Sequence, residues 1–188
     1  MPFGYWVVRL LKGVDIRTIG SGNIGATNVW RVYGRRYGLP VVLLDVAKGF
    51  VPAMLATIYV GHLAGVLAGG AAMLGHWRPL FLRFAKGGKT VATYGGAMFG
   101  VAPWVAFAAL GVWLVVFLAF RYASVASMTA ALALPVLAVA LGYPWPVLAF
   151  TLVAAAAVLV LHRANIKRLR AGTENRFQLR RRRTAAAR

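Results

Sequence analysis

The two longest segments without a charged residue limit what this chain can fold into. Thr90–Phe120 contains no Asp, Glu, Lys or Arg over 31 residues, and Ala123–Leu161 contains none over 39. A helix of about 20 apolar residues crosses the hydrocarbon core of a bilayer. Only 13% of the residues are charged, about half the fraction typical of a soluble domain, and the mean hydropathy is +0.71. The sequence therefore predicts an all-α, polytopic membrane helix bundle that occupies 1–188 as a single domain.

The basic residues are concentrated in three clusters that flank the apolar segments. Of the 22 Lys and Arg residues, six lie in 9–36, four in 78–89 and ten in 163–188, against only three acidic residues in the whole chain. Loops rich in Lys and Arg stay on the cytoplasmic side of a membrane. We therefore expect all three clusters on that side, with an even number of helices between successive clusters. The end of the chain, 177–188, is predicted to be a basic, disordered tail.

Proline and this even count divide the apolar segments into six helices. Proline removes a helix hydrogen bond, so Pro103 is expected to separate a short helix from a full-length one. The short helix covers only about 18 Å at 1.5 Å per residue, so it must tilt into the protein or be re-entrant. Met1–Leu11 is either the cytoplasmic half of a first helix or a short interfacial helix. The six predicted helices are 39–59, 62–76, 90–101, 103–120, 123–141 and 147–161.

Several familiar site motifs are excluded by the residues present. The chain has no cysteine and only three carboxylates, so neither a thiolate nucleophile nor a metal site is predicted. Gly20–Gly25 matches the dinucleotide pattern GxGxxG, but no hydrophobic strand precedes it. A His-x4-Asp acyltransferase dyad is absent, because none of the three histidines is followed by Asp at that spacing. Nucleic acid is excluded as a partner because the positive charges flank predicted spans.

The first basic cluster contains a glycine-rich polar segment that ends at Arg31. Glycine lets backbone N–H groups turn toward an anion, and an arginine guanidinium binds phosphate through two hydrogen bonds. An ordinary polar connector with a helix N-cap at Asn23 or Thr27 is the alternative interpretation. On the first interpretation, the groups that face the anion come from Ser21, Gly22, Asn23, Gly25, Thr27, Asn28 and Arg31.

The second cluster carries a glycine pair between two lysines. Gly87 and Gly88 are flanked by Lys86 and Lys89, and the segment enters a helix at Thr90. Backbone N–H groups at a helix start, together with lysine ammonium groups, suit a phosphate cradle. Lysines that anchor a loop at the membrane surface are the alternative interpretation.

The third cluster and one intramembrane pair complete the candidate residues. His162 and Asn165 are three residues apart and are expected to share one helix face where the chain leaves the membrane. Glu174 is the only acid of this segment and is expected to pair with an arginine. Asp45 and Lys48 are also three residues apart, inside a predicted span, and are expected to neutralise each other in a structural role.

These motifs, in this order, resemble the acyl-phosphate-dependent glycerol-3-phosphate acyltransferases of bacteria, the PlsY family. The resemblance runs from Pro2 to Arg176. The usual family loop reads Phe-Lys-Gly-Gly-Lys-Gly, whereas this chain has an extra residue and Thr90 in place of the last glycine. The matching pieces are Asp15-Ile16-Arg17 with Gly20–Arg31, Leu44-Asp45 with Lys48-Gly49, Gly75-His76 with Pro79, Gly87-Gly88-Lys89 with Val91-Ala92-Thr93, and His162–Glu174.

The resemblance implies transfer of a fatty acyl group from acyl phosphate to the 1-hydroxyl of glycerol 3-phosphate, giving lysophosphatidate and phosphate, without a cofactor. It implies a multi-pass protein of the bacterial inner membrane, in contact with lipids, with a cytoplasmic active site and seven helices, the first truncated here. The family's functional residues correspond to Ser21, Arg31, His162 and Asn165 for activity, to Lys86–Lys89 for glycerol 3-phosphate binding, and to Glu174 for structure. Either His162 or a substrate phosphate oxygen takes the hydroxyl proton. A transporter or channel for a phosphorylated anion is the alternative function.

Overall fold

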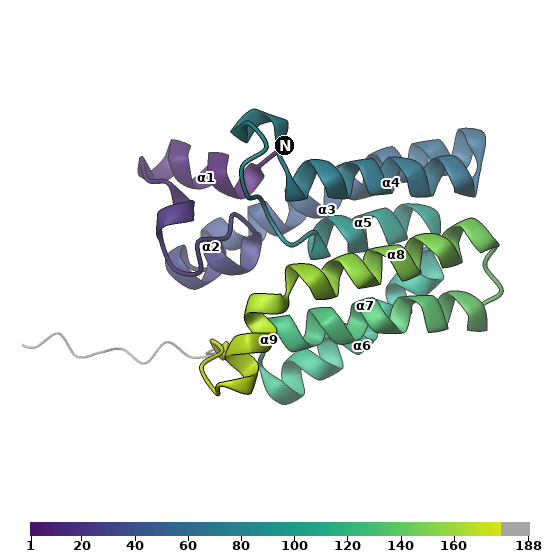
Figure 1. The fold of residues 1–188 in the computed structure, drawn as a ribbon. Helices are drawn as coiled ribbons and strands as arrows, with labels where there is room; N and C mark the ends of the chain where they lie inside the picture. Colours follow the sequence, from purple (N-terminus) through teal and green to yellow (C-terminus); the bar gives the residue numbers. More distant parts are fainter. Residues whose placement is uncertain (178–188) are drawn as a thin grey trace, which may run out of the picture.

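The structure, a computed structural model, describes residues 1–177, and every regular element in that range is a helix. Six apolar helices run alongside one another as a bundle (Figure 1). The six predicted helices are confirmed, with ends shifted by four residues at most. They are α3 (Arg35–Val60), α4 (His62–Trp77), α5 (Val91–Val101), α6 (Pro103–Phe120), α7 (Ala123–Ala140) and α8 (Trp145–Leu161).

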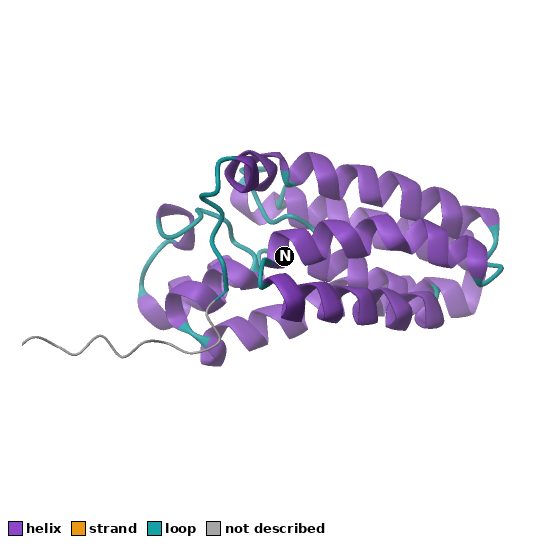
Figure 2. Ribbon diagram, turned by 90° about the horizontal axis from the view of Figure 1, so that it is seen from below, coloured by secondary structure: helices purple, strands orange, loops and turns teal. Residues whose placement is uncertain are grey.

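The described parts of the three basic clusters gather at one end of this bundle. Figures 1 and 2 show the short elements and the long loops at that end, opposite the tight turns that join α3 to α4 and α7 to α8. At the far end, the rings of His62 and Tyr143 lie 6.2 Å apart, which brings those two turns together. The predicted common face of the clusters is therefore confirmed as a common end of the bundle. The short elements are α1 (Phe3–Lys12), η1 (Ile16–Thr18), α2 (Ala26–Tyr33), η2 (Leu80–Leu82) and α9 (Arg163–Arg170).

The outer helices bury small residues and expose large apolar ones, as membrane helices do. α3, α6 and α7 are each long and apolar enough to cross a bilayer, and α8 with α9 is a fourth candidate, bent by 55°. On α6 the buried residues are Val105, Ala106 and Ala109, whereas large side chains such as Leu114 and Leu118 are exposed. Small residues at helix contacts and large apolar residues outside are expected where lipid is the solvent. The chain is an integral membrane protein.

The short helix α5 lies inside the bundle, as the sequence predicted. It ends at Val101, and α6 begins at Pro103. A Cβ on Gly96 would come within 2.0 Å of the Val46 carbonyl oxygen, so α3 and α5 are in backbone contact there. Close packing against α3 therefore holds α5 in place although the helix is too short to span a bilayer. The polar loop that precedes α5 is thus anchored to a rigid helix.

A second, smaller core lies beneath the first basic cluster. It is built from α1, η1, α2 and the start of α3, and its fully buried members include Val8, Ile16, Ile24 and Val41. The segment Met1–Leu11 thus contains a helix that packs one face against the protein. The predicted tail begins in contact with the bundle, because Phe177 donates its backbone N–H to the Arg121 carbonyl over 2.7 Å. Residues 178–188 lie outside the described residues.

The loop between α4 and α5 contains a strained residue at its end. Thr90 has φ 65° and ψ −6°, in the left-handed region, where a β-branched side chain is disfavoured. Its hydroxyl is buried without a hydrogen-bond partner among the described residues. Glycine would adopt this conformation without the steric cost of a Cβ.

We expect Thr90→Gly to stabilise the protein. Relief of the left-handed strain is worth about 1 kcal/mol, or a rise in Tm of about 2–4 °C for a chain of this size. Thermal unfolding in detergent measures the shift. Thr90→Ala is the matched control, because it removes the hydroxyl but keeps the Cβ that causes the strain. Equal shifts for Gly and Ala would assign the effect to the buried hydroxyl instead.

Candidate active site

The glycine-rich loop of the first cluster is held by one buried asparagine. The Asn28 side chain, 2% exposed, accepts a hydrogen bond from the Ser21 backbone N–H over 2.9 Å. Its amide donates to the carbonyls of Ile19 and Asn23 over 3.1 and 2.9 Å. Gly20 has φ 63°, and a Cβ there would lie 2.4 Å from the Asn28 side-chain oxygen. Asn28 therefore shapes the loop that presents Ser21.

Asn23 connects the first cluster to the second. Its side-chain oxygen accepts from the Gly25 N–H over 2.7 Å, and its amide makes a long hydrogen bond of 3.5 Å to the Gly87 carbonyl. The predicted side-chain N-cap at Asn23 or Thr27 is wrong: the N-cap of α2 is Gly25, without a side-chain bond. Thr27 is exposed on the first turn of α2. The segment is consequently more than a capped connector, because it also contacts the glycine pair.

The glycine pair is used differently from the predicted cradle. The N–H of Gly87 donates to the Trp77 carbonyl over 2.9 Å, and that of Gly88 donates to the His76 carbonyl over 3.0 Å. These amides hold the loop against the end of α4, so they do not point to an external anion. The cationic side chains on either side, Lys86 and Lys89, remain the groups of this loop that can face a phosphate.

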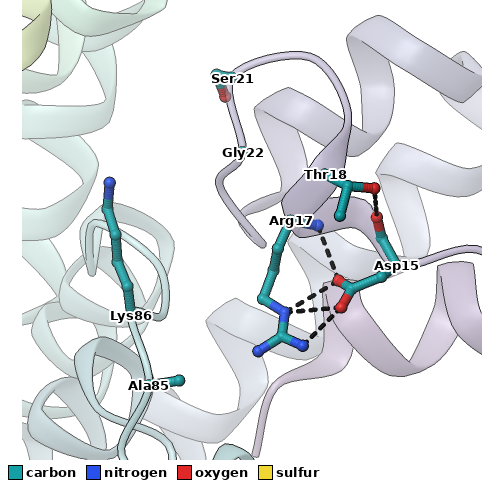
Figure 3. Close-up of a pocket in the computed structure, with 7 residues that line it drawn as sticks. All are labelled: Asp15, Arg17, Thr18, Ser21, Gly22, Ala85 and Lys86. Atoms are coloured by element: carbon teal, nitrogen blue, oxygen red, sulfur yellow. Dashed lines mark hydrogen bonds and ion pairs between the residues drawn. The ribbon is translucent and has the colours of Figure 1, made fainter.

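An open hollow of about 510 Å³ separates the first and second clusters. Figure 3 shows Lys86 on one side and Ser21 and Arg17 on the other. Arg17 is bound to Asp15, with Nη2 2.6 Å from Oδ2. The residues around the hollow are Asp15, Arg17, Thr18, Ser21, Gly22, Ala85 and Lys86.

Lys89 joins the second cluster to the third. Its ammonium donates to the side-chain oxygen of Asn165, which is 5% exposed. Burial, and then the positive charge of Arg168, lower the pKa of Lys89 to about 8. Burial also lowers the pKa of Arg31, whose charge interacts with both Glu174 and Arg168. The structure thus brings one cation from each cluster into one electrostatic neighbourhood.

His162 lies at the bend between α8 and α9, beyond the end of the span, and is 3% exposed. Its Nδ1 is 2.8 Å from the Val158 carbonyl oxygen, so Nδ1 carries the hydrogen and Nε2 has a free lone pair. Burial, and then the charge of Lys89, lower the pKa of His162 to about 4. The side chain is therefore a neutral imidazole at physiological pH. The predicted single helix face with Asn165 is interrupted by the bend, but both side chains are buried beside Lys89.

Glu174 organises the third cluster, and one of its three partners is a serine that the sequence did not single out. Oε1 accepts from Asn165 over 2.6 Å and from Ser124 over 2.7 Å, while Oε2 accepts from Arg168 over 2.7 Å. Burial acts to raise the pKa of Glu174, but these hydrogen bonds lower it overall. The predicted pairing with an arginine is confirmed. Ser124 is the second residue of α7, in an uncharged and mostly apolar segment that carried no signal of this contact.

We expect Glu174→Gln to destabilise the fold by about 2 kcal/mol, because the Arg168 guanidinium loses the charge of the buried Glu174 carboxylate with which it pairs. For a chain of this length that is a fall in Tm of about 4–8 °C. Asp15→Asn is the matched control, because the Asp15–Arg17 pair is exposed and such pairs contribute about 0–1 kcal/mol. An unchanged Tm for Glu174→Gln would remove Glu174 from the structural role.

The intramembrane pair forms as predicted. Lys48 Nζ lies 2.5 Å from Asp45 Oδ1, and the Asp45 side chain is 2% exposed. A third group, which the sequence did not add to the pair, is His76, with Nδ1 2.5 Å from Lys48 Nζ. The pair is therefore part of a buried triad next to the glycine loop.

The assembled site is suited to anions and to proton transfer. Arg31, Lys86 and Lys89 supply positive charge from two clusters, and Ser21 and Asn165 supply neutral hydrogen-bonding groups. The described residues contain no group of three or more His, Asp or Glu side chains that could hold a metal ion. Clamping of phosphate and orientation of a hydroxyl are the chemistry that these residues can perform.

Comparison with known proteins gives these features a family. The sequence profile described as glycerol-3-phosphate acyltransferase matches residues 1–172. The glycerol-3-phosphate acyltransferase of Aquifex aeolicus is 47% identical over 173 residues, which cover 91% of this chain and 90% of that protein. The glycerol-3-phosphate acyltransferase of Geotalea daltonii is 45% identical, with 95% and 91% covered.

Two solved structures of PlsY (YgiH), an integral membrane glycerol 3-phosphate acyltransferase, have the same fold. The glycerol 3-phosphate form superposes with a TM-score of 0.90 at 45% identity, covering 94% of this chain and 88% of that one. The lysophosphatidic acid form superposes with a TM-score of 0.88 at 44% identity, covering 95% and 89%. These matches favour an acyltransferase over the transporter that the sequence left open. The chain belongs to the glycerol-3-phosphate acyltransferase family.

Proposed function

We propose that this protein transfers a fatty acyl group from acyl phosphate to the 1-hydroxyl of glycerol 3-phosphate. The hydroxyl oxygen forms an ester bond to the acyl carbon, the bond from that carbon to the phosphate oxygen breaks, and the products are lysophosphatidate and inorganic phosphate. The observation that carries the proposal is the hydrogen bond from Lys89 to Asn165, which joins the second and third clusters, with the charge of Arg31 in the same electrostatic neighbourhood. The solved relatives, in a glycerol 3-phosphate form and a lysophosphatidic acid form, add support.

The residues divide between the two phosphates and the reacting hydroxyl. Lys89 and Arg31 clamp the phosphate of glycerol 3-phosphate, because they share a neighbourhood with Asn165 and His162. Ser21 and Lys86 face the hollow between the first two clusters and hold the phosphate of the acyl donor. Asn165, fixed between Lys89 and Glu174, orients the hydroxyl. The proton of the substrate hydroxyl passes to His162 Nε2 or to a phosphate oxygen of the donor.

An acyl phosphate needs no covalent enzyme intermediate. Phosphate is a good leaving group, so positioning and charge stabilisation are sufficient to accelerate direct attack by the hydroxyl. The chain has no cysteine, and neutral His162 is available to accept the proton. The second cationic surface, with Ser21 and Lys86, favours acyl phosphate over thioesters as the donor, because a thioester carries no phosphate on its reacting carbon.

A donor assay tests this function. Purified protein in detergent receives radiolabelled glycerol 3-phosphate with palmitoyl phosphate, palmitoyl-CoA or acyl carrier protein loaded with palmitate. We expect labelled lysophosphatidate and one equivalent of phosphate with palmitoyl phosphate, and little product with either thioester. Efficient turnover with palmitoyl-CoA alone would refute the acyl-phosphate donor.

The active site is proposed to face the cytoplasm of the bacterial inner membrane. The support is the common end at which the basic clusters meet, because Lys- and Arg-rich loops stay on the cytoplasmic side. Lipids surround the exposed apolar faces, and the acyl chain of the donor reaches the site from them.

We expect single cysteines at Arg36 and Arg83 to resist membrane-impermeant thiol reagents in intact cells. Both side chains are exposed at the basic end of the bundle, and the chain has no cysteine of its own. Tyr59→Cys is the matched control, because Tyr59 is 80% exposed near the opposite end and should be labelled from outside. Labelling of Arg36→Cys or Arg83→Cys in intact cells would reverse the orientation.

A further inference from the structure

A buried histidine next to the glycine loop has no role in the reaction described above. His76 lies in the last turn of α4 and is 3% exposed. Its Nδ1 is 2.5 Å from Lys48 Nζ and 3.6 Å from Asp45 Oδ1. Because the Lys48 ammonium donates to Nδ1 and to Asp45, the ring is held in one orientation. This triad costs desolvation of three polar groups within the bundle, which calls for a function beyond filling space.

The ring of His76 is the surface on which Gly88 rests. A Cβ added to Gly88 would lie 1.8, 2.5 and 2.7 Å from Nε2, Cε1 and Cδ2 of that ring. The Gly88 N–H donates to the His76 carbonyl over 3.0 Å, so backbone and ring of the same residue fix this point of the loop. The φ angle of Gly88 lies outside the left-handed region, so its backbone does not require glycine. Glycine is required at this position because the His76 ring leaves no room for a Cβ.

We propose that His76 is a positioning residue for Lys89. Its ring, held in place by Lys48 and Asp45, fixes the position of the Gly88 backbone and thereby the position of the Lys89 ammonium. The inference rests on the proposed function, in which Lys89 binds the phosphate of glycerol 3-phosphate. Asp45 and Lys48 then act on substrate binding at a distance, through the ring rather than by contact with the ligand.

The neighbouring glycine supplies a matched control. A Cβ on Gly87 would lie 2.2 Å from the His76 carbonyl oxygen, 2.7 Å from the Trp77 carbonyl oxygen and 2.8 Å from Pro79 Cδ. None of these atoms belongs to the His76 ring. Removal of the ring therefore makes room for alanine at Gly88 but not at Gly87.

Compensating variants test the proposal through the KM for glycerol 3-phosphate. Gly88→Ala should raise this KM about tenfold with little change in kcat, since the loss is in ground-state binding. His76→Ala alone should raise it about threefold, because the loop loses its support. In the double variant Gly88→Ala/His76→Ala the KM should return to about that of His76→Ala, which is a coupling that independent sites do not show. Adding His76→Ala to Gly87→Ala should not lower the KM of that variant for glycerol 3-phosphate.

Two further measurements separate the possible failures. The rise in Tm given by a fixed concentration of glycerol 3-phosphate reports binding without turnover, and it should be smaller in Gly88→Ala and return to that of His76→Ala in the double variant. His76→Asn, which keeps a hydrogen-bond acceptor for Lys48 but vacates the ring's space, should rescue Gly88→Ala as well as alanine does. Wild-type protein without acyl transfer to glycerol 3-phosphate would refute the proposed function itself.

Several results would overturn the inference while leaving the function standing. One is an active wild type whose Gly88→Ala variant is not rescued by either substitution of His76. Another is equal rescue of Gly87→Ala, which would point to general loosening of the loop. Loss of folded protein in every His76 variant, with folded Gly88→Ala, would assign the ring to the fold alone.

Discussion

Replacement of His162 by alanine is expected to lower kcat about 10²–10⁴-fold, with a much smaller change in either KM. The reason lies in how the ring is held. Nδ1 donates to the Val158 carbonyl 2.8 Å away, which leaves the lone pair of Nε2 free to accept a proton. A neutral, oriented imidazole is the arrangement that general-base catalysis requires. Steady-state kinetics with acyl phosphate and labelled glycerol 3-phosphate measure the effect.

The size of the loss also identifies the proton acceptor. If a phosphate oxygen of the donor takes the proton, His162→Ala removes only positioning, and kcat falls about tenfold or less. With a pKa of about 4, His162 is neutral above that pH, so its titration should leave kcat level between pH 6 and 8. His62→Ala is the matched control, because His62 stands at the opposite end of the bundle and should leave the kinetics unchanged. Wild-type kcat and KM in His162→Ala would exclude this residue from the site.

The helices were predictable because lipid imposes a simple rule on the sequence. Uncharged runs, Pro103 and the three basic clusters were sufficient to place six helices and their common polar end. The short helix α5 followed from the even count and was confirmed as a buried helix. The bend at His162 was not predicted, because no proline or glycine marks it.

The contacts among the clusters were harder to predict than the clusters themselves. The sequence indicated that Gly87 and Gly88 are special, but it attributed this to an anion rather than to the carbonyls and the ring at the end of α4. Ser124 belongs to an apolar segment, and its bond to Glu174 spans 50 residues. Such long-range pairs depend on how helices pack, which one sequence does not encode in any local pattern.

Replacement of Lys89 by methionine is expected to raise the KM for glycerol 3-phosphate about 10- to 100-fold, because a charge-assisted bond to phosphate is lost while the side-chain volume is kept. The kcat should change much less. Lys12→Met is the matched control, because the exposed Lys12 side chain lies over the ring of Tyr37 and does not line the hollow. A Lys89→Met enzyme with the wild-type KM would assign binding of the glycerol 3-phosphate phosphate to Arg31 alone.

The same lysine predicts how substrate binding depends on pH. Burial and the charge of Arg168 lower the pKa of Lys89 to about 8, so the ammonium is mostly present at pH 7 and mostly lost at pH 9. If only the ammonium binds the phosphate, the wild-type KM for glycerol 3-phosphate rises about tenfold between these values. The substrate contributes little to this change, because a phosphate monoester with a second pKa of about 6 is already a dianion there.

Lys89→Arg keeps its charge throughout, since guanidinium does not titrate in this range, and should give a flat profile. An identical rise in Lys89→Arg and wild type would show that another group titrates, whereas a flat wild-type profile would mean that bound phosphate does not depend on the charge of Lys89.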